Sequence, residues 1–73
     1  MWTLTKEDAR TRETLATKTY ETDDDLNAFY GSLDVFPYYE QRCPDSDHRI
    51  IQVWDTTPIY GQEPKYTFRL TRQ

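Results

Sequence analysis

The sequence predicts a small α+β domain, a single-layer antiparallel sheet with one amphipathic helix packed on one face. One segment has apolar residues at the helical period, and several others alternate apolar and polar residues as half-buried strands do. The connections between these segments are short, which favours antiparallel neighbours. The expected order is β-β-α-(β)-β-β, in one domain that spans residues 1–73.

The first twenty residues have the pattern of two strands joined by a tight turn. Trp2 and Leu4 alternate with threonines, and the run from Glu13 to Tyr20 is again rich in threonine. The polar residues 8–12 separate the two runs. A helix over 6–18 is the competing interpretation, but that segment has no apolar face, so a hairpin is favoured.

The segment 22–33 has the clearest helical pattern in the chain. Thr22 is a suitable N-cap, and three aspartates follow it at the end of the helix where the dipole favours negative charge. Leu26, Phe29, Tyr30 and Leu33 fall at i, i+3, i+4 and i+7. This spacing places them on one face, which we expect to pack on the sheet.

The second half of the chain is predicted to supply the rest of the sheet. Residues 38–42 form a short candidate strand, and the turn-forming residues 44–47 separate it from 49–55, the most β-like run. That run is expected to be a central strand that is partly covered on both sides. Residues 56–64 form a loop bracketed by two prolines, and 65–72 alternates as a half-buried strand does.

Composition and charge limit the classes of function. The single cysteine, Cys43, excludes an internal disulfide and a multi-cysteine metal site, and it suits a reducing compartment. No apolar run is long enough for a signal peptide or a membrane span, so we expect a soluble cytoplasmic protein. The net charge is −4, but from Glu21 to Glu63 ten acids face two bases, a local balance of −8. This acidic middle disfavours direct binding to nucleic acid and favours a basic partner surface.

Few residues offer catalytic or metal chemistry. Asp23, Asp24 and Asp25 occupy adjacent helical positions that point in different directions, which fits capping better than a metal site. Cys43 and His48 are a nucleophile and a base five residues apart, but the sequence shows no orienting third group for them. We therefore expect no catalytic residue, no metal site and no cofactor.

Aromatic residues in or beside loops are the best candidates for a functional surface. Tyrosine supplies large, rigid contact area and is enriched in binding hot spots, and nearby acids would form a charged rim. The alternative is that two or three of these rings only seal the end of a small core. The predicted partner-binding residues are Asp34, Phe36, Tyr38, Tyr39, Glu40, Asp55, Tyr60 and Glu63.

These features favour a non-enzymatic regulator or inhibitor that docks on a larger protein with a basic surface. Nucleic-acid-processing machines have basic grooves, so an RNA polymerase, a nuclease or a CRISPR effector is a candidate partner. Small virus-encoded inhibitors share this size and charge, and a viral origin would place the protein in the host cytoplasm. We expect a monomer or weak homodimer that does not bind a membrane.

Two other classes of function stay open. A small hydrolase that uses Cys43 or His48 is one of them. The other is a single-stranded nucleic-acid-binding module, in which Trp and Tyr rings stack on bases and a track of Lys and Arg follows the backbone. The net charge of −4 opposes this module. The basic track would consist of Arg10, Arg12, Lys65, Arg69 and Arg72.

Overall fold

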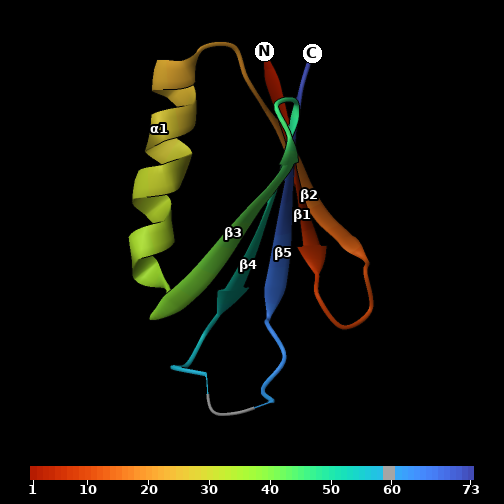
Figure 1. Cartoon of the computed structure of the whole chain (residues 1–73), viewed down its shortest axis with the longest axis vertical. Helices are drawn as coiled ribbons and strands as arrows, with labels where there is room; N and C mark the ends of the chain where they lie inside the picture. Colours follow the sequence, from red (N-terminus) through yellow and green to blue (C-terminus); the bar gives the residue numbers. More distant parts are fainter. Residues whose placement is uncertain (59–60) are drawn as a thin grey trace.

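A five-stranded antiparallel sheet with one helix lying across one face forms the protein (Figure 1). The computed structural model describes residues 1–58 and 61–73. The predicted α+β class, the single sheet and the order of helix and strands are confirmed. The elements are β1 (Trp2–Asp8), β2 (Thr14–Tyr20), α1 (Asp23–Ser32), the 3₁₀ helix η1 (Leu33–Val35), β3 (Tyr38–Asp45), β4 (His48–Trp54) and β5 (Tyr66–Arg72).

The strands lie in the order β2-β1-β5-β4-β3, so the last strand is at the centre of the sheet. β1 pairs with β5 along its whole length, from Trp2 opposite Arg72 to Asp8 opposite Tyr66. The backbone N–H of Gln73 donates to the carbonyl of Met1 at 2.9 Å, so the two ends of the chain lie side by side (Figure 1).

The predicted N-terminal hairpin is confirmed, and the alternative helix over 6–18 is not formed. The connection is held by the carboxylate of Asp8, which accepts the backbone N–H groups of Arg10 at 2.9 Å and Thr11 at 3.0 Å. These hydrogen bonds stabilise the ionised form and lower the pKa of Asp8. Arg12 adopts φ 63°, the left-handed conformation that allows the tight reversal.

The helix begins as predicted. The Thr22 hydroxyl accepts the backbone N–H of Asp25 at 3.1 Å and so caps α1. Leu26, Phe29 and Leu33 of the predicted stripe are buried, and Tyr30 packs beside them partly exposed. The core lies between this stripe and the sheet, and its buried members are Trp2, Leu4, Tyr20, Leu26, Phe29, Leu33, Ile51, Val53, Phe68 and Leu70.

Trp2 connects the sheet to the start of the helix. Its indole N–H donates to the carboxylate of Asp23 at 3.2 Å, and the Arg49 guanidinium lies 4.4 Å from its ring centroid. Arg49 also donates to the Tyr30 hydroxyl at 2.9 Å, and that hydroxyl donates to Gln41 at 2.8 Å. Trp2 and Arg49 therefore link α1 to β1, β3 and β4. The order of these strands in the sheet determines where the acidic start of α1 lies.

The second half of the chain differs from the prediction in its boundaries. β3 runs on to Asp45, past the predicted end at Arg42, and the turn contains only residues 46 and 47. Pro44 is accommodated because β3 is an edge strand with a register shift between Arg42 and Asp45, where a missing N–H breaks no ladder. β4 and β5 agree with the predicted runs to within one residue at each end.

Within the described residues, no helix has the length and apolar character needed to cross a membrane.

Candidate protein interaction surface

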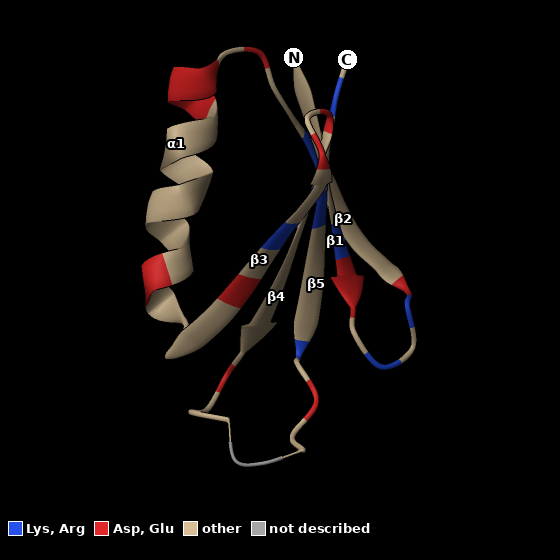
Figure 2. Ribbon diagram, viewed as in Figure 1, with Lys and Arg blue, Asp and Glu red and all other residues tan. Residues whose placement is uncertain are grey.

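Six of the thirteen acidic residues lie between residues 20 and 41, in α1, in the segments beside it or in the edge strand β3. From residue 20 to residue 41 the chain contains six acids and no Lys, Arg or His. Figure 2 shows them at the start of α1, just after its end, and in the middle of β3. They are Glu21, Asp23, Asp24, Asp25, Asp34 and Glu40.

Acids elsewhere in the chain are often neutralised by a nearby base. Of the ion pairs that the described residues form, none reaches any of the six acids between residues 20 and 41. The negative charge on the α1 side is therefore left uncompensated. The pairs that do form are Arg69–Glu7 at 3.0 Å, Lys65–Asp55 at 3.2 Å, Arg72–Asp47 at 3.2 Å and His48–Asp45 at 2.8 Å.

Apolar side chains are exposed at the junction between α1 and β3. Val35 is 79% exposed, Tyr39 43% and Tyr38 39%, and among residues 1–58 and 61–73 they are three of the five large hydrophobic side chains that are exposed. They follow Asp34 and precede Glu40 in the chain. We define the α1–β3 surface as the six acids together with Val35, Tyr38 and Tyr39.

The two adjacent tyrosines lie on opposite faces of the sheet. Tyr39 is paired with Val53, on the face that α1 covers, whereas Tyr38 is paired with Trp54 on the open face. The Tyr38 and Trp54 ring centroids are 5.2 Å apart, edge to face. The Tyr38 hydroxyl donates to Glu40 at 2.7 Å, and this bond raises the pKa of Tyr38. β3 therefore presents the Tyr38 ring on the open face of the sheet and the Tyr39 ring on the face that α1 covers.

Other predicted site residues lie apart from this edge. Phe36 packs against Tyr66 and Phe68, with ring centroids 6.3 and 6.4 Å away, and so extends the core. The Lys65 ammonium donates a hydrogen bond to the Asp55 carboxylate, and this bond raises the pKa of Lys65.

Glu63 is exposed in the loop that precedes β5, and Tyr60 lies outside the described residues. The structure thus places Tyr38 and Glu40 on the open face of β3, and Tyr39 on the face that α1 covers. Asp34 lies in η1, Phe36 packs against the core, and Asp55 is in an ion pair.

Five members of the α1–β3 surface are not among the partner-binding residues predicted from the sequence: Glu21, Asp23, Asp24, Asp25 and Val35. The three aspartates occupy the first turn of α1, as the capping interpretation expects, and Asp24 and Asp25 are also exposed. The missed signal is the absence of any base between Lys18 and Arg42. Val35 falls outside the helical stripe and precedes the extended Phe36–Pro37 segment, which leaves it no core to face.

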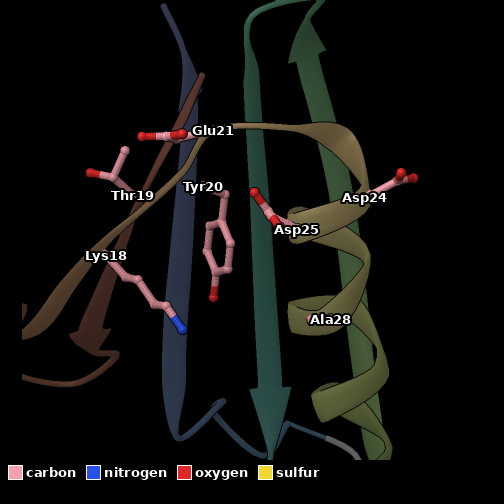
Figure 3. Close-up of a pocket in the computed structure, with 7 residues that line it drawn as sticks. All are labelled: Lys18, Thr19, Tyr20, Glu21, Asp24, Asp25 and Ala28. Carbon is pink, nitrogen blue, oxygen red and sulfur yellow. The ribbon is translucent and has the colours of Figure 1, made fainter.

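A shallow hollow of about 430 Å³ lies between β2 and the start of α1. In Figure 3, Asp25 points toward Tyr20 across this hollow, whereas Asp24 points away from it. The Lys18 ammonium lies 5.1 Å from the Tyr20 ring centroid. The hollow is lined by Lys18, Thr19, Tyr20, Glu21, Asp24, Asp25 and Ala28.

Cys43 and His48 bond to different partners. The Cys43 sulfur accepts from the Gln41 amide at 3.5 Å, while the His48 ring bonds the Asp45 carboxylate at 2.8 Å. This bond, together with the N–H of Asp47, lowers the pKa of Asp45. In the part of the chain that the structure describes, no three His, Cys, Asp or Glu side chains are placed to share a metal ion.

No family model, curated protein or solved structure matches this chain, so its function has to be inferred from its own residues.

Proposed function

We propose that this chain is a non-enzymatic regulator or inhibitor that docks its α1–β3 surface on a basic surface of a larger protein. The observation that carries the proposal is the set of six acids without a base between residues 20 and 41, none of them in an ion pair among the described residues. Uncompensated charge on one side of a small protein attracts an oppositely charged partner and speeds their encounter.

The exposed apolar side chains at the α1–β3 junction support docking by contact as well as by attraction. Long-range charge mainly raises the association rate, whereas buried aromatic contacts mainly slow dissociation. Val35 and Tyr39 are exposed and follow Asp34 in the chain, so apolar side chains are available for contact beside an acid at this junction. Apolar contact with polar groups beside it is the usual anatomy of a protein interface.

A nucleic-acid-processing enzyme is the partner class that we favour. The groove of such an enzyme is lined by Lys and Arg that neutralise phosphates, and a row of carboxylates satisfies the same side chains. The acids at the two ends of α1 are separated by the ten residues of the helix, a rise of about 15 Å. The single cysteine suits a partner in the cytoplasm.

Direct binding of single-stranded nucleic acid has less support. Of the five bases that would form its track, Arg69, Lys65 and Arg72 each pair with a carboxylate of this chain. A mobility shift with single strands at low salt tests this alternative, and binding that salt abolishes would favour it over the docking proposal.

The docking proposal is tested with the partner captured from the source cell and then purified. Asp34→Lys should slow association several-fold, and the difference should shrink as salt rises, since screening shortens to about 8 Å near physiological ionic strength. Glu13→Lys makes the same charge change in the hairpin connection, away from the α1–β3 surface, and is the matched control. Equal slowing by both variants would refute the assigned surface.

Three further variants distinguish binding by contact from catalysis. Tyr39→Ala should speed dissociation about 30-fold if this ring is a hot spot, the equivalent of about 2 kcal/mol. Cys43→Ser and His48→Gln should leave binding and inhibition unchanged, because the two side chains are bonded to different neighbours. Loss of function in both of these folded variants would support an enzyme instead.

A further inference from the structure

The two edges of the sheet differ in how they are protected against pairing with another strand. Edge strands in natural proteins are usually blunted by charges, proline or bulges, because their free N–H and C=O groups can otherwise template a new strand. β3 has such protection, with Glu40, Arg42 and Pro44 along it and a register shift before Asp45. β2 has one charged residue, Lys18, and no proline.

β2 is also open to solvent. Six of its seven residues are exposed, and only Tyr20 at its end is buried. The register with β1 steps from Lys6–Ala16 to Glu7–Thr14, so Leu15 has no partner across the ladder. Leu15 is 46% exposed, an apolar side chain on an open edge.

The direction of the backbone groups on β2 follows from the neighbouring ladder. Gln73 donates to the Met1 carbonyl, and Ala9 donates to the Lys65 carbonyl, so odd-numbered residues of β1 bond toward β5. Antiparallel strands alternate the direction of these groups, so even-numbered residues of β1 bond toward β2.

The even-numbered residues of β1 determine which groups of β2 stay free. Trp2 and Leu4 are paired with Tyr20 and Lys18. The backbone groups of Tyr20 and Lys18 therefore bond toward β1. Thr17 lies between Lys18 and the register shift, and its N–H and C=O point to the open edge of the sheet. Thr19 does the same, which leaves a short unpaired ladder on β2.

We propose that this edge pairs with the β2 edge of a second copy of the chain, antiparallel, about a two-fold axis through Thr17. Thr17 is the central residue of Thr14–Tyr20, so this register pairs the strand along its full length. It sets Lys18 opposite Ala16 and Leu15 opposite Thr19, which covers the exposed leucine and places no two charges of the strand face to face. Shifting the axis to Lys18 would put two ammonium groups opposite each other, which is unfavourable.

A second copy fits this edge better than an open-ended assembly. An isologous contact about a two-fold axis uses β2 of both copies and leaves the protected β3 edges outside, so growth stops at two. The resulting ten-stranded sheet carries both α1 helices on the same face, because the two-fold axis of an antiparallel strand pair runs perpendicular to the sheet. Pairing of two short strands buries less than the roughly 1,200 Å² of a standard interface, so the dimer is weak.

The test is the mass of the intact protein, measured by sedimentation velocity as the protein concentration is raised to about 1 mM. At that concentration even a weak dimer with a dissociation constant of about 1 mM is detected. We expect the mass to rise from 8.8 kDa toward twice that value. Thr17→Lys and Thr17→Glu should each stay monomeric, because like charges meet across the axis. An equimolar mixture of the two should dimerise again. Thr57→Lys makes the same charge change in the loop after β4 and should dimerise like the wild type.

A second variant removes the backbone donor itself. Thr17→Pro deletes an N–H that the intramolecular ladder does not use, so the fold should be retained by circular dichroism while the dimer is lost. A wild-type mass that stays at 8.8 kDa throughout would overturn the proposal. So would a dimer that survives Thr17→Lys and Thr17→Pro, or a charge-variant mixture that stays monomeric.

Discussion

The two faces of the sheet are built from different residues and are stabilised in different ways. Under α1, the sheet presents Ile51, Val53, Phe68 and Leu70, all buried against the helix. The opposite face has no helix over it, and β1 contributes Thr3, Thr5 and Glu7 to it, with cross-strand partners that are mostly Thr and Arg.

Besides Trp54, which is 7% exposed and donates its indole N–H to the Gln62 carbonyl, the open face is held by pairs between neighbouring strands. The Arg69–Glu7 ion pair at 3.0 Å is one of them, and the Tyr38–Trp54 ring pair is another. Cross-strand pairs contribute about 0.2–1 kcal/mol each, whereas complete burial of a large apolar side chain contributes about 1.5–3 kcal/mol. Stability therefore comes mainly from the covered face, which leaves the open face and the strand edges free to change.

The largest expected effect is at the centre of the covered face. The Phe29 ring lies 5.2 Å from that of Phe68 and 5.5 Å from that of Tyr30, centroid to centroid. Phe29→Ala should lower the free energy of unfolding by about 3–5 kcal/mol, enough to unfold a marginal domain. Denaturant titration monitored by circular dichroism measures the change. A loss below about 1 kcal/mol would mean that α1 is not docked through this ring.

Two adjacent isoleucines of β4 compare the faces directly. Ile51 is fully buried under α1, while Ile50 is partly exposed on the opposite face. Ile51→Ala should cost about 2–5 kcal/mol, and Ile50→Ala about 1 kcal/mol or less, because only part of its surface leaves water on folding. Equal losses of unfolding free energy in the two variants, measured by the same denaturant titration, would contradict this difference between the faces. They would require a second covering layer over the open face.

The covered face was largely predictable from the sequence, because periodicity reports which residues share a face. The stripe from Leu26 to Leu33 identified the helix, and alternation placed Ile51 and Phe68 inward. The order of the strands was not predictable, because alternation does not say which strand is a neighbour. The pairing of Trp2 with Arg72 joins opposite ends of the chain.

The arrangement of the candidate site depends on contacts that the sequence does not show. Tyr38 and Tyr39 are adjacent in the predicted patch, and the strand register places them on opposite faces of the sheet. Phe36 was grouped with them because its neighbours are loop residues, and only the tertiary structure brings it against Phe68. Ion pairing is equally invisible in the sequence, since Glu7 and Arg69 are 62 positions apart.

The cap of α1 should show an intermediate effect. The Thr22 hydroxyl accepts the backbone N–H of Asp25 at the start of the helix, so Thr22→Ala should cost about 1 kcal/mol and speed amide exchange in the first turn. Thr22→Ser keeps the hydroxyl and is the matched control. Unchanged exchange at Asp25 in Thr22→Ala would mean that the N-cap does not stabilise the covering helix.

The smallest effect should come from an exposed ion pair at the β3–β4 turn. Asp45 bonds His48 and the N–H of Asp47, and these bonds hold its pKa below the usual 3.8. A carboxylate with a lowered pKa in the folded state stabilises the fold above its unfolded pKa, and this stabilisation is lost as the pH falls through the folded value.

Asp45→Asn should therefore be slightly less stable than the wild type at pH 7, by less than Thr22→Ala, because the pair is about half exposed and screened by solvent. The difference between the two proteins should shrink below about pH 4, as protonation removes the charge from the wild-type side chain. Thermal unfolding from pH 7 to pH 2 measures it. A difference that grows as the pH falls below about 4 would contradict the assignment to the Asp45 carboxylate. A difference that rivals Ile51→Ala would contradict the conclusion that exposed pairs contribute less than the covered face.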